Sequence, residues 1–204
     1  MPNRAQMLKF SCAIRQAQKV LPSYMPGLFV LTDPVRTPDC VFLADQLPRG
    51  CGLIYRHFGA PDRKAVAVRL KHIARRKRLT LLIGNDPALA RSIEADGVHW
   101  PEAAVHKARY WRKYFPIMTG AAHSRAAIQY GKSVGLDALL LSSVFPSKSP
   151  SAPPSTIGAS RFRDQARCAG IPLYGLGGVK AQNAGRIAGV AGLASIEGAI
   201  DAFC

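Results

Sequence analysis

Short apolar runs recur along the chain, and each ends in polar or turn-forming residues. At 138–144 the run enters Ser142 and Ser143, and Pro146 and Pro150 follow it. An apolar run of this length, bounded by turn residues, predicts a strand that is buried on both faces. The same pattern predicts strands at 28–32, 53–55, 79–83, 97–100, 117–120, 138–144, 171–176 and 192–196.

Segments with helical spacing separate most of these strands. They lie at 65–76, 87–95, 104–114, 125–134, 160–169 and 182–188. Strands that alternate with helices indicate parallel pairing through right-handed crossovers, because a parallel neighbour needs a long return connection. Eight such strands favour an α/β fold of the closed (β/α)8 TIM barrel type, and a doubly wound open sheet is the alternative.

The length of the chain allows one small barrel and leaves no room for a second domain. Its 204 residues lie near the lower limit of about 200 residues for this fold. Residues 1–26 have helix-compatible spacing that Pro22 and Pro26 terminate. We therefore expect an N-terminal helical extension over 1–26, packed under the barrel floor or against its side, and the barrel itself over 27–204.

The composition is that of a globular protein. Hydrophobic residues make up 48% of the chain, charged residues 20%, and the mean hydropathy is +0.03. No apolar stretch approaches the roughly 20 residues that span a bilayer, and the N-terminal residues lack the apolar centre of a signal peptide. We therefore expect a cytoplasmic protein with no membrane partner. Five cysteines without a C-x-x-C pair argue against a disulfide framework and a structural zinc site.

The chain is strongly basic, with 28 Lys and Arg residues against 12 Asp and Glu residues and a net charge of +16. Such a charge attracts nucleic acids or anionic metabolites. Many basic residues lie on predicted helices, at 69–78 and 107–113, where a solvated outer face explains them. A nucleic-acid partner is disfavoured because no binding motif is present, unless the two helices form one continuous basic stripe. Homo-oligomer formation is left open.

Polar residues that can bind an anion follow the predicted strands. In a parallel barrel, the loops at the carboxyl ends of the strands meet at one mouth, where such barrels carry their active sites. The mouth would then hold basic groups, carboxylates, a histidine and glycine-rich loops. Such a set suits the binding of a phosphorylated small molecule. The candidates are Arg56, Asn85, Asp86, Glu102, His123, Ser147, Lys148, Ser149, Gly177 and Gly178.

The order of short motifs along residues 27–200 resembles the thiamine phosphate synthase/TenI family. The resemblance implies a small TIM barrel that binds thiazole phosphate. Synthase members join a pyrimidine diphosphate to thiazole phosphate with the help of magnesium, whereas TenI members include a thiazole tautomerase. The motifs that carry the resemblance are Leu31-Thr32-Asp33, Gly84-Asn85-Asp86, Ala95-Asp96-Gly97-Val98-His99, Gly120 to Ser124, Val144-Phe145-Pro146-Ser147-Lys148-Ser149, Leu176-Gly177-Gly178-Val179, Asn183-Ala184 and Gly189 to Ile196.

The resemblance also implies roles for individual residues. The phosphate of the thiazole would lie against Gly177, Gly178, Ser195 and Ile196. The diphosphate side would use Arg56, Asn85 and the loop of Ser147, Lys148 and Ser149, and Asp86 would bind magnesium. Several positions differ from those that the family resemblance implies. Ile54 stands in place of a glutamine, and Phe58 in place of a lysine. Ala104 stands in place of a metal-binding aspartate, Ala121 in place of a serine, and Pro150 in place of a lysine. With Glu102 as the substitute carboxylate, we expect at most a weak Mg²⁺ site.

His123 matches a TenI histidine that is implicated in proton transfer, and imidazole suits acid–base chemistry near neutral pH. It also begins a predicted helix beside Ser124, where a histidine can simply cap or pack. His99 is expected to line the barrel mouth, and His57, His72 and His106 to lie on the surface. Three functions follow, in this order: a TenI-like enzyme, a synthase with a rebuilt magnesium site, and a non-catalytic relative that binds a phosphorylated ligand.

Overall fold

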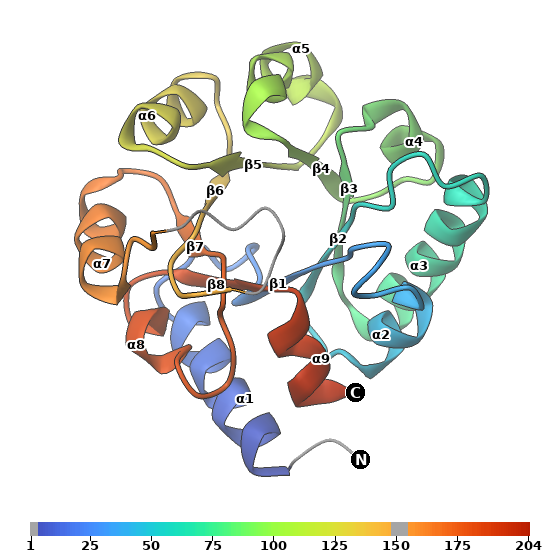
Figure 1. The fold of residues 1–204 in the computed structure, drawn as a ribbon. Helices are drawn as coiled ribbons and strands as arrows, with labels where there is room; N and C mark the ends of the chain where they lie inside the picture. Colours follow the sequence, from blue (N-terminus) through green and yellow to red (C-terminus); the bar gives the residue numbers. More distant parts are fainter. Residues whose placement is uncertain (1–3, 148–154) are drawn as a thin grey trace.

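Eight short parallel strands close into a barrel within residues 4–147 and 155–204, the part of the chain that the computed structural model describes (Figure 1). Each strand pairs with the next along the chain, and β8 pairs with β1 through the register Phe29↔Ala194. The predicted TIM barrel is therefore confirmed, and the open sheet is wrong. The strands are β1 (Leu28–Leu31), β2 (Gly52–Tyr55), β3 (Thr80–Gly84), β4 (Gly97–Trp100), β5 (Ile117–Ala122), β6 (Ala138–Leu141), β7 (Leu173–Gly175) and β8 (Gly192–Ser195).

Helices surround the barrel and cover its outer face (Figure 1). Two of the longer ones, α1 and α3, have 15 residues each, and no helix in the described ranges is long and apolar enough to cross a membrane. The helices are α1 (Arg4–Gln18), α2 (Cys40–Gln46), α3 (Arg63–Lys77), α4 (Pro87–Ser92), the 3₁₀ helix η1 (Glu102–Lys107), α5 (Ala108–Trp111), the 3₁₀ helix η2 (Arg112–Tyr114), α6 (Arg125–Ser133), α7 (Ala159–Cys168), α8 (Gly185–Ala188) and α9 (Glu197–Phe203).

Several predicted elements differ from the observed ones. The helix expected at 104–114 is a chain of η1, α5 and η2, because apolar residues three apart suit a 3₁₀ helix as well as an α-helix. The sequence reading missed α2, although Asp39 caps it by accepting a 2.8 Å hydrogen bond from the Phe42 N–H. The strand expected at 138–144 ends earlier, at Leu141.

Aromatic rings fill the interior of the barrel. The rings of Phe29 and Tyr174 lie 4.9 Å apart, and the Tyr174 hydroxyl donates a 2.7 Å hydrogen bond to the carbonyl of Pro26 at the floor. Gly52 and Gly192 leave the space for these rings, since a Cβ at either glycine would overlap one of them. The interior is thus a packed core and not a pore.

Substitution of Gly52 with alanine is expected to lower the free energy of unfolding by about 1–3 kcal/mol, because the added methyl group overpacks the ring of Phe29. Urea unfolding measures this loss. Gly185→Ala is the matched control, since a Cβ at Gly185 meets open space. Equal stability of the two variants would contradict the packing described for the barrel interior.

The N-terminal segment packs both at the side of the barrel and on its floor. Helix α1 contacts α8 and α9 (Figure 1), and the rings of Phe10 and Phe203 stack at 5.7 Å. After the helix, Met25 joins the aromatic core inside the barrel. The helix of this segment therefore lies against the outer helices α8 and α9, and the residues after it lead into the first strand.

Candidate functional site

Arg56 is anchored at the corner between β1 and β2. Its backbone N–H donates to the Thr32 hydroxyl at 2.9 Å, and its Nε donates to the Thr32 carbonyl at 3.1 Å. The Asp33 carboxylate lies 3.9 Å from the guanidinium. Burial lowers the pKa of Arg56 from its ordinary value, and Asp33 opposes that shift. The main chain thus fixes the orientation of the arginine that was expected to meet an anion.

Asp33 itself is held by the turn that follows it. Its carboxylate accepts a 2.7 Å hydrogen bond from the Arg36 side chain and further bonds from the N–H groups of Val35 and Arg36. These contacts, led by the Arg36 side chain, lower the pKa of Asp33 to about 2. The negative charge beside Arg56 is therefore permanent near neutral pH.

Asp86, the expected metal ligand, is engaged by its own chain. One carboxylate oxygen caps α4 by accepting the Leu89 N–H at 2.9 Å, and the other accepts Nη1 of Arg63 at 2.7 Å. The neighbouring Asn85 is exposed, adopts φ 50°, and donates its backbone N–H to the His99 carbonyl. The sequence reading did not single out Arg63, which belongs to a different element.

His123 follows β5 and faces Glu102, the first residue of η1. The Nδ1 of His123 lies 2.7 Å from Oε2 of Glu102, and the two side chains are 60% and 40% exposed. The hydroxyl of Ser124 caps α6 by accepting the Ala127 N–H at 3.1 Å, so His123 is not required for the cap. A groove of about 560 Å³ between η1 and α6 is lined by Glu102, Ser124 and Tyr130 among others, but not by His123.

His99 lies inside the mouth of the barrel, as expected. It is only 5% exposed and shares a 2.9 Å hydrogen bond with the Thr119 hydroxyl. Burial, assisted by the charge of Arg56, lowers the pKa of His99 to about 3. A ring that stays neutral under ordinary conditions cannot act as a general acid near neutral pH. The expectation for His57 is wrong: it is buried beside Tyr55, whereas His72 and His106 are exposed.

The loops after β6, β7 and β8 pack against one another. Gly177 and Gly178 have φ values of 92° and 60°, and a Cβ at either would overlap the loop after β6, at Ser143 or Pro146. The buried Ser195 hydroxyl donates to the Val179 carbonyl at 2.8 Å, and Ile196 precedes α9. Glycine is thus required at 177 and 178 by the backbone conformation and by the close packing of these loops. Phosphate binding at this place stays a prediction. Ser147 is described, whereas Lys148 and Ser149 lie outside the described residues.

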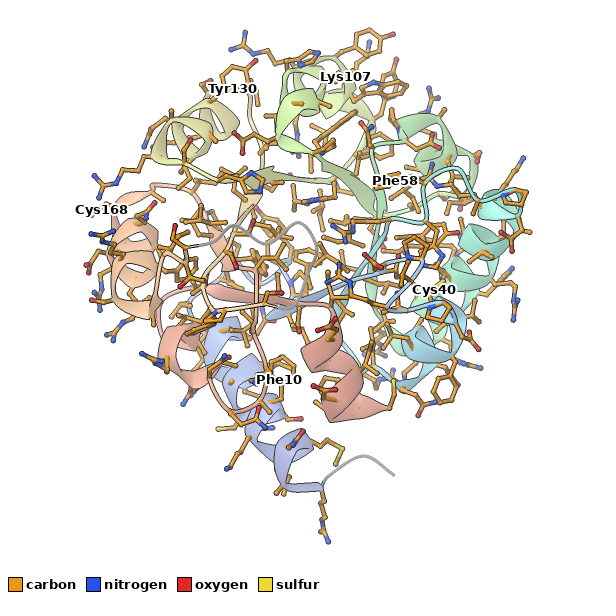
Figure 2. All side chains as sticks on the ribbon, viewed as in Figure 1. Phe10, Cys40, Phe58, Lys107, Tyr130 and Cys168 are labelled. Atoms are coloured by element: carbon orange, nitrogen blue, oxygen red, sulfur yellow. The ribbon has the colours of Figure 1, made fainter. Side chains whose placement is uncertain are left out.

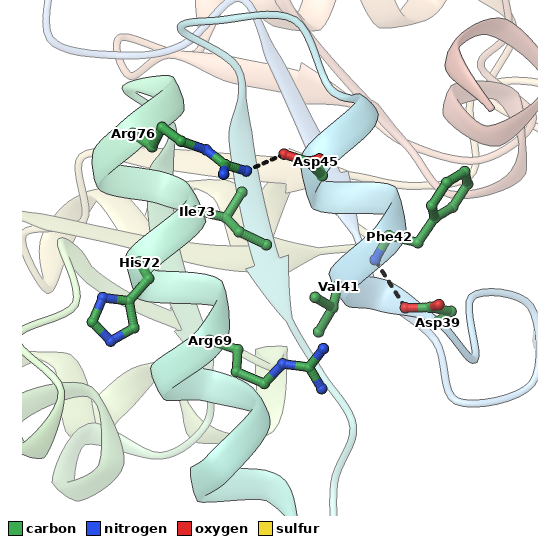
Figure 3. A pocket seen from close by; sticks show the side chains of 8 residues that line it. All are labelled: Asp39, Val41, Phe42, Asp45, Arg69, His72, Ile73 and Arg76. Atoms are coloured by element: carbon green, nitrogen blue, oxygen red, sulfur yellow. Dashed lines mark hydrogen bonds and ion pairs between the residues drawn. The ribbon is translucent and has the colours of Figure 1, made fainter.

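A second groove, of about 480 Å³, lies between α2 and α3 on the outside of the barrel (Figure 3). Ion pairing between Arg76 and Asp45 spans it, and Val41 and Ile73 form its apolar part. It contains none of the predicted site residues.

Acidic residues neutralise part of the basic surface of α3. Lys71 pairs with Asp96 and Arg75 with Glu94, and both acids lie beyond the end of α4, which stands between α3 and α5 (Figure 1). Basic residues and aromatic rings also cover η1, α5 and η2 (Figure 2). Two basic side chains of α3 are thus paired with acids of a neighbouring segment.

Comparison with known proteins decides the family. The model of the protein family described as thiamine monophosphate synthase matches residues 45–199 of this chain. The chain belongs to this family. It is 28% identical over 162 residues to "Putative thiamine-phosphate synthase 2" of Aquifex aeolicus, covering 76% of this chain and 86% of the relative. A thiamine-phosphate synthase of Marinobacter nauticus is 30% identical over 169 residues, with 78% and 75% covered.

Solved structures agree in fold. The thiamine phosphate pyrophosphorylase from Pyrococcus furiosus has a TM-score of 0.73 and 22% identity to this chain, with 92% of this chain and 93% of the other covered. At this identity, the likeness shows the fold alone. Membership of the family places the protein in thiamine biosynthesis and indicates a phosphorylated small-molecule ligand.

The residues present do not fit the magnesium that the family resemblance implies. Asp86 is paired with Arg63, and Glu102 is paired with His123. In the described part of the chain, no group of three or more His, Cys, Asp or Glu side chains is arranged to hold a metal ion. Magnesium requires several oxygen ligands in near-octahedral geometry, and neither carboxylate offers them in this arrangement.

Proposed function

We propose that this protein binds a thiazole phosphate and moves a proton on its ring, the tautomerase type of reaction in its family, with His123 as the acid–base group. The hydrogen bond between Glu102 and His123 carries this proposal. An ionised carboxylate accepts the proton of Nδ1, so that Nε2 is left as the base. Nε2 would take a proton from one ring position and return it to another, which needs no metal and no co-reactant.

The same hydrogen bond argues against the synthase reaction. Dissociation of a diphosphate needs fixed positive charge and hydroxyl groups, and loss of one such group commonly costs about 100-fold in rate. Here Glu102 and Asp86 are engaged by other side chains, and Ala121 and Phe58 replace two polar family positions. The names of the curated relatives favour the synthase as the second candidate. A non-catalytic binder is the third.

Two assays on the purified protein separate these functions. We expect tautomerisation of the thiazole carboxylate phosphate to proceed in the presence of EDTA. We also expect no thiamine phosphate when the protein is given magnesium, pyrimidine diphosphate and thiazole phosphate. Rapid formation of thiamine phosphate would establish the synthase, and no turnover in either assay, together with retained binding of thiazole phosphate, would establish the binder.

Replacement of Glu102 with glutamine is expected to lower the kcat of tautomerisation about tenfold or more with little change in KM. Glutamine keeps the size of the side chain but removes the charge that orients and stabilises the imidazolium during proton transfer. Glu94→Gln is the matched control, because Glu94 is also an exposed glutamate with a 2.7 Å ionic partner, Arg75. Equal kcat in both variants would remove Glu102 from the mechanism.

A further inference from the structure

Arg63 reaches from the start of α3 to the carboxyl end of β3. Its Nη1 donates to the Asp86 carboxylate at 2.7 Å, and its Nη2 donates to the Gly84 carbonyl at 2.8 Å. The Arg63 side chain is 16% exposed and that of Asp86 is 31% exposed. The planar fork of the guanidinium therefore holds two oxygen atoms at once, and it does so in a partly desolvated place where an ion pair is screened less than at the surface.

Aromatic rings enclose this guanidinium. Its central carbon lies 5.9 Å from the ring centre of Tyr55 and 5.5 Å from that of Phe58, within the range of cation–π attraction. Nε of Arg63 is buried and has no hydrogen-bond partner among the described residues. Phe58 occupies the position where the family resemblance predicts a lysine. Phe58 thus carries no charge of its own and forms a wall beside the guanidinium of Arg63.

The two oxygens that Arg63 holds are of the types that hard cations prefer. A carboxylate and a backbone carbonyl are ligands for magnesium and manganese, which bind through oxygen. A divalent ion that bound both oxygens would have to share them with the guanidinium and would lie beside its positive charge. Arg63 and a metal ion therefore compete for the same oxygens.

We propose that Arg63 is the fixed cation of this half of the mouth, takes the place of a divalent ion at Asp86, and makes the half-site independent of metal. Arg63 is thus a residue that determines metal specificity, and Asp86 is its structural partner. This assignment concerns metal binding in the absence of ligand, and it stands whether or not the protein is a tautomerase.

Titration of the ligand-free protein with Mn²⁺, followed by calorimetry and by the electron paramagnetic resonance signal of free Mn²⁺, tests the assignment. We expect the wild type to bind no tighter than the millimolar range and to be indistinguishable from Asp86→Asn. Arg63→Met, which removes the charge but keeps an apolar side chain, is expected to bind Mn²⁺ at least tenfold more tightly. Addition of Asp86→Asn to Arg63→Met should abolish that gain.

Two further variants control for charge and for folding. Arg63→Lys keeps a cation near Asp86 and is expected to bind Mn²⁺ as weakly as the wild type. Arg75→Met removes an exposed arginine from the same helix, whose partner Glu94 is 77% exposed, and should also leave binding unchanged. Micromolar binding by the wild type that Asp86→Asn removes would overturn the assignment. A folded Arg63→Met variant without any gain would overturn it as well, and if that variant does not fold, the wild type and Asp86→Asn decide.

Discussion

Replacement of His123 with alanine is expected to lower the kcat of tautomerisation at least about 100-fold, the usual contribution of a positioned general acid or base. The dissociation constant for thiazole phosphate should change by less than about twofold, because a group that acts mainly in the transition state contributes little to ground-state binding. The side chain of His123 is 60% exposed and hydrogen-bonds Glu102, so its removal should leave the fold intact. Single-turnover kinetics and equilibrium binding measure the two quantities.

His106→Ala is the control for this experiment, since His106 is an exposed histidine on the neighbouring η1. It should retain full activity. Equal turnover in the wild type and in His123→Ala would exclude His123 as the acid–base group. Absence of turnover in both proteins, with binding retained, would leave the non-catalytic binder as the function.

Acidification is expected to destabilise the protein through His99. The pKa of this buried ring is about 3 in the folded protein against an ordinary 6.5, so the unfolded chain binds a proton at a pH where the folded one does not. The contribution of His99 to stability is therefore intact above pH 6.5 and falls as the pH drops towards 3. Linkage gives a loss of roughly 2–3 kcal/mol between pH 7 and pH 4.5, and of roughly 4–5 kcal/mol at pH 3.

Urea unfolding at pH 7 and pH 4.5 measures this loss, and His99→Gln provides the comparison. The glutamine amide can hydrogen-bond Thr119 but does not titrate, so the variant should lose less stability than the wild type over the same interval. Asp33 does not interfere, since its pKa is lowered from 3.8 to about 2 and its contribution is lost only as the pH falls through that lower range. An identical pH dependence in both proteins would show that His99 can be protonated in the fold.

Periodicity and motif order were sufficient to predict the architecture and the family. Each barrel strand is a short apolar run between turns, because its side chains are buried both inside the barrel and under the outer helices. The local pattern of apolar residues is therefore enough to predict the strands. The barrel and the family are confirmed by the strand pairing and by the match over residues 45–199. Errors were confined to local features, such as the missed helix α2 and the broken helix at 104–114, where more than one helical geometry fits the same spacing.

The candidate site was predicted only as a set of loops at one mouth. The sequence placed Asp86, Glu102 and His123 after β3, β4 and β5, and the structure finds them there. It did not indicate that Glu102 meets His123 or that Arg63 meets Asp86. These pairs are 21 and 23 residues apart, and each joins side chains from two different elements. Such contacts depend on where a helix begins relative to the neighbouring strand, and hydrophobic spacing does not specify this.

The amino-acid sequence by itself thus determined the barrel, its order of strands and the family, because these follow from local patterns that repeat along the chain. Only the tertiary structure decided which polar side chains meet one another at the mouth. It placed the guanidinium of Arg63 against the Asp86 carboxylate and turned Glu102 towards His123. The physical reason is that a charged side chain binds whichever opposite charge the fold brings within a few ångströms, and that distance is set by the packing of separate helices and strands.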